Sequence, residues 1–591
     1  SMLQRQPEIE DGNVILHRSP NFFLRTVYQA GQVVNPLRRP TGRTTMLPRV
    51  MPQQEKRIAS SETRLMPKVT LTGNLTQTKA FPLPAWMEAV VVVLGLMASF
   101  AAHAYNMFNF PRYELDEGTY MSSAWAILNG LITPYPYGYG HPPLAWIQIA
   151  GWVQLTGGFF TFGNALNSGR VLMLLFALGC SLLVYLVVRR MGGSRSASLL
   201  AMVIFSLSPI SLTYQRQVLL DNVGIFWLLL SIYFIVASNS RLLFIVLGAV
   251  CFGIALLSKE IFLLFTPVMI YGVWLHTTKF QRKFALIAFS YTVIALGSTF
   301  ILLAILKGEL LPTGWLPWDH QQHLSLVDTF FSQAERTQSQ GSFSGSWSAW
   351  TSADFVLMAF SIVPVVFNLI VGWWNRKQLF LALLAISFWL LLVRGGVVLT
   401  FYIIPLIPLA AINAAIAINT VMGWLSKLVH LELVRALLIL VIIGVIVPYD
   451  LLHAQIVFTQ HPTSAQTDAM VWIRNNGATY PYANVYFNIA YDPELYTGLL
   501  QGNWDRIDYI VADSEMLNDI KTFGGPMLLI DKALNHSVLR SQFSADDHDS
   551  QIVISIYQVI HQIAPPLAYH GPAGAQQTAF SYDKQIWNRE T

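Results

Sequence analysis

Long apolar segments separated by short polar turns dominate the chain between residues 81 and 450. Several of these segments run for about 18 or more residues, the length that an α-helix needs to cross the hydrocarbon core of a bilayer. The pattern predicts a polytopic helical membrane protein with about eleven spans. We expect these spans at residues 84–105, 171–188, 199–212, 217–237, 242–257, 261–275, 284–306, 355–373, 380–393, 397–418 and 437–448.

One apolar segment, residues 144–162, is better explained as a helix at the membrane surface than as a span. It carries tryptophans, which favour the headgroup level, and it is interrupted by Gly151, Gly157 and Gly158. Leaving it out places the paired arginines Arg189 and Arg190, with most later Lys/Arg clusters, on the same side as the N-terminus. The positive-inside rule then predicts a cytoplasmic N-terminus and an extracytoplasmic C-terminus in the inner (plasma) membrane.

The two ends of the chain differ in composition from the apolar middle. Residues 1–80 contain twelve basic and five acidic residues among many Pro, Gln and Thr. This composition predicts a basic, disordered cytoplasmic arm beside anionic lipid, and no folded basic module points to nucleic acid. Residues 451–564 predict a small extracytoplasmic α/β domain, and residues 565–591 predict a disordered tail. In that domain we expect a helix from Thr463 to about residue 476 and strands at 484–488, 508–512, 527–530 and 552–560.

Overall composition supports a membrane protein and excludes a cysteine-based framework. Hydrophobic residues make up 54% of the chain and charged residues only 12%, against roughly 25% charged in soluble domains. The two cysteines, Cys180 and Cys251, both lie in apolar segments, where they form neither a disulfide framework nor a metal-binding spacing.

A cluster of polar residues follows the first expected span, in the outer loop 106–168. Asp116, Glu117 and Tyr120 stand close together, and His141 precedes a Pro-Pro pair, Pro142-Pro143. Because charged groups near hydrocarbon are expensive, such a cluster is a candidate functional site.

Further polar residues fall at the same predicted face of the membrane: Arg216, Asp221, Lys259, Glu260 and Arg394. Each alone is compatible with a helix-end ion pair or a snorkelling side chain. The long outer loop 307–353, which includes His320 and several tryptophans, is either a lid or binding loop or an interfacial cover.

These residue types suit the transfer of a group from a lipid phosphate. Cations stabilise the phosphate as charge develops on it, and a carboxylate removes the proton of the acceptor hydroxyl. An inverting sugar transfer needs this arrangement, with one base at the acceptor and stabilisation of the leaving group opposite.

The order of the motifs over residues 84–450 resembles the GT-C membrane glycosyltransferases, in the branch of protein O-mannosyltransferases and lipid A aminoarabinose transferases (families 39 and 83). The motifs are Asp116-Glu117-Gly118-Thr119-Tyr120, His141-Pro142-Pro143-Leu144, Arg216 to Asp221, Leu257-Ser258-Lys259, and Tyr402-Ile403-Ile404-Pro405-Leu406-Ile407-Pro408.

The resemblance implies a polyprenyl-phosphate sugar as donor and a hydroxyl of a protein, lipid or glycan as acceptor. It implies that Asp116 is the catalytic base or acceptor-binding carboxylate and that Glu117 supports it. The residues expected to contact the donor phosphate are His141, Lys259, Arg394 and Arg216, and those expected to support the site are Tyr120, Asp221, Glu260 and Tyr402.

Two other functions remain open from the sequence. A transporter or flippase of a lipid-linked or anionic substrate would place charges near the membrane midplane, between repeated broken helices, and neither feature is visible. A membrane scaffold would leave the acidic cluster merely solvated. A divalent metal is possible, although Asp116, Glu117 and His141 have no recognisable ligand spacing.

Overall fold

A computed structural model of the chain defines most of the apolar middle and parts of the C-terminal region. It describes residues 84–133, 137–159, 161–319, 323–335, 342–429, 432–476, 485–487, 490–491, 507–513, 517, 526–547 and 550–560. The predicted arm 1–80, the predicted tail 565–591 and His320 lie outside these residues.

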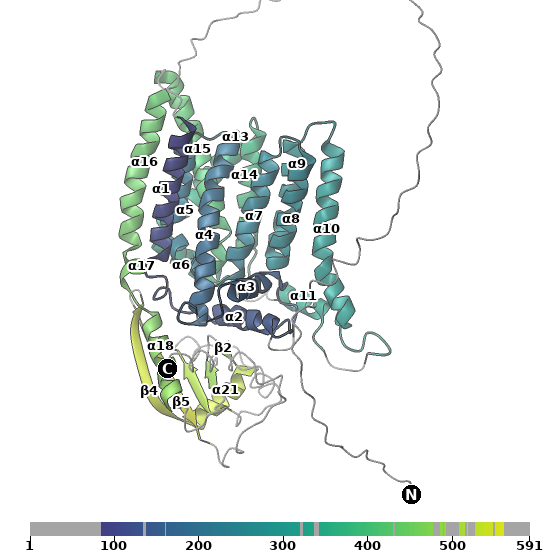
Figure 1. The fold of residues 1–591 in the computed structure, drawn as a ribbon, viewed down its shortest axis with the longest axis vertical. Coiled ribbons are helices and arrows are strands. Elements are labelled where there is room, and N and C mark those ends of the chain that lie inside the picture. Colours follow the sequence, from purple (N-terminus) through teal and green to yellow (C-terminus); the bar gives the residue numbers. More distant parts are fainter. Residues whose placement is uncertain are drawn as a thin grey trace, which may run out of the picture. The chain divides into compact units, whose positions relative to one another are not determined.

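Helices standing side by side form the main body (Figure 1). They are α1 (Ala85–Ala104), α4 (Ala165–Arg190), α5 (Arg195–Leu207), α7 (Leu220–Ala237), α8 (Leu242–Ser258), α9 (Thr266–His276), α10 (Arg282–Lys307), α13 (Phe355–Val371), α14 (Arg376–Val393), α15 (Leu406–Val429) and α16 (Glu432–His453). A one-turn helix, α6 (Pro209–Tyr214), and two 3₁₀ helices, η1 (Glu260–Phe265) and η3 (Thr400–Ile403), connect them.

Seven helices of the described part are long and apolar enough to cross a membrane. The number is eight if α13 and the preceding α12 (Phe343–Ala353), bent by 108° against each other, form one span. The prediction of a multi-pass membrane protein is confirmed. The predicted total of about eleven requires the shorter helices α5 and α8 and the pair η1–α9 to cross as well, so it remains a prediction.

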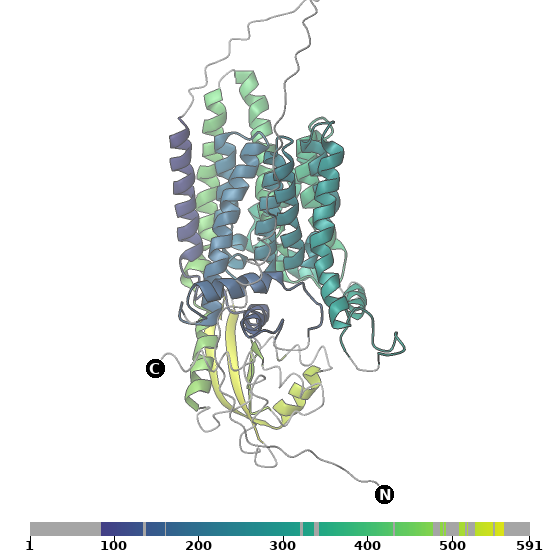
Figure 2. The same cartoon turned by 45° about the vertical axis from the view of Figure 1, so that its right-hand side comes forward.

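Two helices of the loop 106–168 lie across one end of the bundle (Figures 1 and 2). They are α2 (Leu115–Leu128) and α3 (Leu144–Leu155). Gly157 and Gly158, with φ of 93° and 123°, follow α3 in a backbone region that other residues rarely adopt. Helix α3 has 12 residues, which is shorter than a membrane span requires, and its place at the membrane surface stays a prediction.

Polar side chains join the apolar helices at a few buried points. The hydroxyls of Ser99, Ser181 and Ser206 form a chain of 2.9 Å contacts that links α1, α4 and α5. Asn368 on α13 donates to the backbone and side-chain oxygens of Asn413 on α15, each at 2.9 Å. Such interhelical bonds supplement van der Waals packing, because lipid provides no hydrophobic force between spans.

The chain after α16 forms the predicted mixture of helix and strand. Helices α17 (Gln455–Thr459) and α18 (Thr463–Asn476) precede a sheet of β1 (Val485–Phe487), β2 (Ala490–Tyr491), β3 (Tyr509–Ala512), β4 (Ser537–Asp547) and β5 (Ser550–Val559). The strand order is β2-β1-β3-β5-β4, with β1 and β3 parallel and the other pairs antiparallel.

One predicted strand of this domain is wrong. Residues 527–530 belong to a helix, α21 (Pro526–Asn535), and not to a strand. Ile530 and Ala533, three residues apart, are both buried in the same small core, as one face of a helix requires. A four-residue apolar run fits either element, and only the wider spacing distinguishes them.

Candidate functional site

Helix α2 begins where the acidic motif lies, so its first turn carries both candidate carboxylates. The backbone N–H of Glu114, the residue before the helix, donates to the Glu117 side chain at 3.2 Å. This contact is one half of a capping box, which fixes the start of a helix. Asp116 and Glu117 then point in different directions, and their environments differ.

Glu117 is fully buried and paired with Arg170 of α4. The guanidinium donates to both carboxylate oxygens, at 2.8 and 3.0 Å, and neither side chain is exposed. The backbone N–H of Val218 adds a third bond, at 3.0 Å. A buried ion pair is stable only when its remaining hydrogen-bonding groups are also satisfied. For the Glu117 carboxylate, the backbone N–H groups of Glu114 and Val218 provide these additional hydrogen bonds.

Arg170 also fixes the loop that leads into α2. It donates to the carbonyls of Met107, Pro111 and Arg112 at 2.9, 3.0 and 3.3 Å, and its guanidinium lies 4.6 Å from the ring centre of Tyr113. No sequence motif identifies this residue, although it is the single arginine directly before the expected span 171–188. Its role depends on a partner 53 positions away, which no local pattern indicates.

Asp116 is half-buried and lies among charged groups from other elements. The Tyr120 hydroxyl, one turn further along α2, donates to it at 3.4 Å. Burial raises the pKa of Asp116, and the positive charges of Lys259 and His141 oppose this rise, whereas the negative charge of Asp221 adds to it. The structure therefore brings these four predicted residues together.

The cation of this group is Lys259, at the junction of α8 and η1. Its ammonium lies 2.6 Å from a carboxylate oxygen of Asp221 in the first turn of α7, and both side chains are almost fully buried. The same ammonium lies 5.2 Å from the ring centre of Tyr402, on η3. The second oxygen of Asp221 has no hydrogen-bond partner in the described part of the chain.

His141 faces the same region from the loop before α3. Its Nδ1 lies 2.8 Å from a carboxylate oxygen of Glu260, the residue after Lys259. Its ring lies edge-on to that of Tyr120, with centroids 6.3 Å apart, and its carbonyl accepts a 2.5 Å bond from Tyr137. The predicted supporting residues Tyr120, Glu260 and Tyr402 thus all lie in this cluster.

Two predicted phosphate-binding arginines have other surroundings. Arg216 is buried and donates to the carbonyl of Ala102 at the end of α1, at 2.8 Å, and to that of Phe110. It thereby ties α1 to the loop before α2. Arg394 is exposed at the end of α14, and Gly395 and Gly396 follow it with positive φ.

The long outer loop packs onto the loop that carries His141. Tyr139 donates to Glu309, and Thr329 of α11 (Leu326–Glu335) donates to the carbonyl of Gly138, both at 2.5 Å. Further along, Trp350 of α12 is buried and donates to the carbonyl of Thr400 at 2.6 Å. These contacts join the two outer loops and the segment before Tyr402.

No group of three or more His, Cys, Asp or Glu side chains that could hold a metal ion occurs among the residues that the structure describes. The acidic and histidine side chains of the site are instead engaged in pairs, such as His141 with Glu260 and Asp221 with Lys259.

Comparison with known proteins finds one family model that matches part of the chain. Residues 96–308 match the model of the family described as dolichyl-phosphate-mannose-protein mannosyltransferase. The matched part contains α2, His141, Asp221 and Lys259, so the resemblance drawn from the motifs is confirmed. The match covers 213 of the 591 residues, so the chain resembles this family over that part. No curated protein matches the chain.

Solved structures give weaker likenesses. The Saccharomyces cerevisiae protein O-mannosyltransferase Pmt1-Pmt2 complex is 18% identical over 38% of this chain and 34% of that chain, with a TM-score of 0.31. The match therefore spans about a third of that protein. The Archaeoglobus fulgidus oligosaccharyltransferase AglB is 11% identical over 84% and 77%, with a TM-score of 0.49. ArnT from Cupriavidus metallidurans is 15% identical over 83% and 99%, with a TM-score of 0.47.

Breaking the buried pair tests its structural role. Arg170→Ala leaves Glu117 charged and unpaired in the interior, so we expect the protein to lose about 3–5 kcal/mol of stability. The measurement is thermal unfolding in detergent. Arg112→Ala is the matched control, because its ion pair with Glu114 is partly exposed at 3.4 Å and is worth less than about 1 kcal/mol. Equal losses in the two variants would contradict this role.

The pH dependence of sugar transfer tests the environment of Asp116. The role of base expected for Asp116 requires a deprotonated carboxylate, so this role predicts a rate that rises with pH through the raised pKa of Asp116. The hydrogen bond from Tyr120 lowers that pKa. Tyr120→Phe should therefore move the acidic limb of the profile to higher pH, by less than about one unit. Tyr105→Phe, an exposed tyrosine at the end of α1, should leave the limb unchanged. A limb that stays or moves to lower pH in Tyr120→Phe contradicts the assignment.

Proposed function

We propose that the protein transfers a sugar from a polyprenyl phosphate to an acceptor hydroxyl of a protein, lipid or glycan at the extracytoplasmic face, with inversion. The observation that carries this proposal is the position of the half-buried Asp116 carboxylate. It accepts a hydrogen bond from the Tyr120 hydroxyl and lies near enough to Lys259 and His141 to interact electrostatically with both. A carboxylate next to cations from other elements is the combination that a base and a phosphate site require together.

In the proposed step, Asp116 takes the proton of the acceptor hydroxyl as its oxygen attacks the anomeric carbon. The bond between that carbon and the phosphate oxygen breaks on the opposite side, and its electron pair stays on the phosphate. Lys259 and His141 stabilise the negative charge that develops there. A raised pKa suits Asp116 to this role, because a base works best when its pKa approaches the working pH.

The partners of these residues have positioning roles in the proposal. Asp221 holds the Lys259 ammonium at 2.6 Å, and Glu260 orients the His141 ring at 2.8 Å. Glu117 positions rather than reacts, because its two oxygens accept hydrogen bonds from Arg170, Val218 and the backbone of Glu114.

The two remaining arginines receive different proposals. Arg394 is exposed beside two glycines, which leaves room for a donor phosphate to approach its guanidinium. Arg216 was expected to contact this phosphate too, but its buried bonds to Ala102 and Phe110 favour the proposal that it fixes α1 to the loop before α2.

For the topology we propose about eleven spans, with the N-terminus cytoplasmic and Asp116 facing outward in the inner (plasma) membrane. The short helices α5, α8 and η1–α9 complete this number. Arg189 and Arg190 lie at the C-terminal end of α4, and α2 with Asp116 lies beside the opposite end of that helix. By the positive-inside rule, this arrangement supports a cytoplasmic position for the arginines and an extracytoplasmic position for Asp116. The α/β domain at 451–564 is then extracytoplasmic, where we propose that it assists acceptor binding.

Asp116→Asn tests the base directly. Purified protein would be incubated with a panel of radiolabelled polyprenyl-phosphate sugars and candidate acceptors, with and without a chelator. We expect transfer to fall by about 10²–10⁴-fold, the usual contribution of a general base, with unchanged thermal stability. Asp468→Asn, an exposed carboxylate on α18, should transfer at the wild-type rate. Transfer by a well-folded Asp116→Asn at the wild-type rate contradicts the proposal.

Lys259 and Asp221 require a paired test, because losing one partner leaves the other charged in the interior. Lys259→Met alone should lose about 3–5 kcal/mol of stability, and Lys259→Met with Asp221→Asn should recover most of it. The double variant should still bind polyprenyl phosphate about tenfold or more weakly, since a charged hydrogen bond contributes about 1.5–3 kcal/mol. Wild-type binding by the stable double variant would remove Lys259 from the phosphate site.

A further inference from the structure

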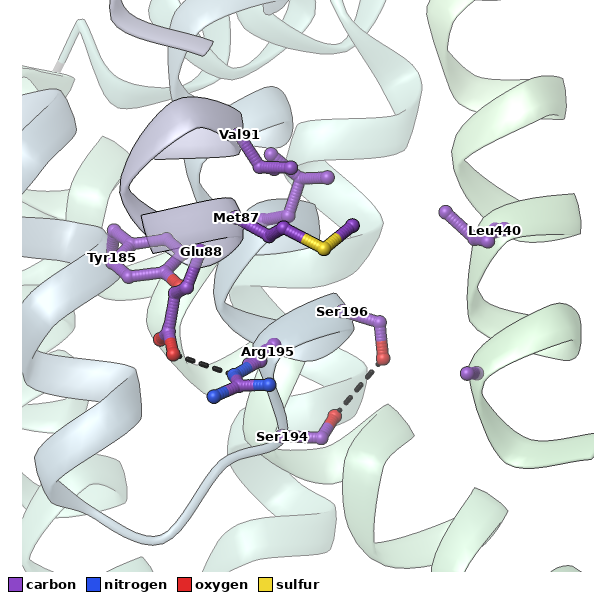
Figure 3. Close-up of a pocket in the computed structure, with 10 residues that line it drawn as sticks. Met87, Glu88, Val91, Tyr185, Ser194, Arg195, Ser196 and Leu440 are labelled. Carbon is purple, nitrogen blue, oxygen red and sulfur yellow. Dashed lines mark hydrogen bonds and ion pairs between the residues drawn. The ribbon is translucent and has the colours of Figure 1, made fainter. Parts of the chain in front are cut away.

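A pocket lies near the start of α1, at the far end of this helix from the Asp116 site (Figure 3). It has a volume of about 420 Å³, within the range of small-molecule sites. Its lining residues come from α1, α4, α5 with its N-cap, and α16: Met87, Glu88, Val91, Tyr185, Ser194, Arg195, Ser196, Leu199, Ala436 and Leu440. Glu88 precedes the end of α1 at Ala104 by about 24 Å along the helix, so this pocket is separate from the Asp116 site.

One part of the pocket is an apolar groove between two membrane helices. Helices α1 and α16 both pack on α5, and Leu199 of α5 belongs to the lining. Leu440 of α16 faces Met87 across the gap (Figure 3). Val91 and Leu440 are 44% and 48% exposed, although both helices cross the apolar part of the membrane. In a bilayer such surface contacts hydrocarbon, so the groove suits an acyl chain.

The other part of the pocket is polar, with Glu88 and Arg195 in its lining and Arg189 and Arg190 nearby at the end of α4. Glu88 accepts bonds from Tyr185 and Arg189 at 2.8 Å and from Arg195 at 2.5 Å. Arg190 is also exposed at this end of α4, so three arginines stand against one glutamate. The side chain of Arg195 is 37% exposed and lines the pocket together with the hydroxyls of Ser194 and Ser196, 3.1 Å apart.

We propose that this pocket binds one anionic phospholipid. Its acyl chain lies between α1 and α16, and its phosphate faces Arg195 and the hydroxyl of Ser196. A zwitterionic phospholipid would gain less from the neighbouring arginines, because its own ammonium offsets the charge of its phosphate, and inorganic phosphate would gain nothing from the apolar groove. The combination selects a molecule that carries both parts, and basic side chains at the membrane surface attract anionic headgroups.

Such a lipid would contact both α1 and α16, which are far apart in the sequence. The segments that follow α1 and α16 are already joined by hydrogen bonds. Asn106, after α1, donates to the carbonyls of Val457 and Gln460, after α16, at 3.1 and 2.8 Å. A phospholipid between α1 and α16 would add a contact at the opposite end of the same two helices. We therefore expect it to stabilise the fold.

Thermal unfolding of delipidated protein tests the proposal. Phosphatidylglycerol should raise the midpoint by several degrees in a saturable manner, and phosphatidylcholine with the same acyl chains should raise it less. Inorganic phosphate should have no effect. Equal shifts with the two lipids contradict the anionic headgroup, and a shift with inorganic phosphate alone contradicts the lipid.

Variants locate the effect in the pocket. Ala436→Phe fills the apolar groove and should abolish the shift, whereas Leu437→Phe, the next residue on α16 and outside the lining, should retain it. Arg195→Gln should remove the preference for phosphatidylglycerol. Retention of the wild-type shift and preference in Ala436→Phe would overturn the proposal.

Native mass spectrometry tests lipid binding with the wild-type protein alone, so its result does not depend on the folding of any variant. After exchange into equal amounts of phosphatidylglycerol and phosphatidylcholine, we expect one retained phosphatidylglycerol per chain. Retention of neither lipid, or of both equally, would contradict the site.

Discussion

The buried pair of Glu117 and Arg170 is the interaction on which the site depends. It joins the first turn of α2 to α4, to the backbone of Val218 before α7 and, through Arg170, to three carbonyls of the preceding loop. Because both charges are fully buried, the pair is stable only with this complete set of partners. Asp116, one residue away, is thereby directed toward Lys259 and His141. The two residues of the acidic dipeptide thus have different surroundings, and our proposal gives the chemical role to Asp116 alone.

The site is assembled from loops that meet at the ends of membrane helices. Lys259 and Glu260 lie at one helix break, and they pair with Asp221 of α7 and His141 of the first outer loop. A break between α8 and η1 therefore sets two oppositely charged side chains next to each other, each with its own partner. The second outer loop fixes the first through Tyr139 and Thr329. This arrangement gathers the charged groups at the ends of the membrane helices, where we propose that a lipid-linked substrate binds.

The sequence predicts the helical membrane fold because apolar length is a strong signal, and it predicts which polar residues meet because alternating spans place them at one face. Arg170 was missed because its partner is distant in sequence, and nothing local distinguishes it from an ordinary helix-end arginine. Arg216 was grouped with the phosphate contacts, but a face of the membrane does not specify the direction of a side chain. The strand expected at 527–530 is a helix, since four apolar residues do not define a period.

The most direct test of the account is the anomeric configuration of the product formed from a polyprenyl-phosphate sugar of known configuration. A carboxylate in the position of Asp116 can act either as a base in a single displacement or as a nucleophile in a double displacement. We assign Asp116 the first role and expect a product of inverted configuration. A product of retained configuration would contradict it and would make Asp116 a candidate nucleophile.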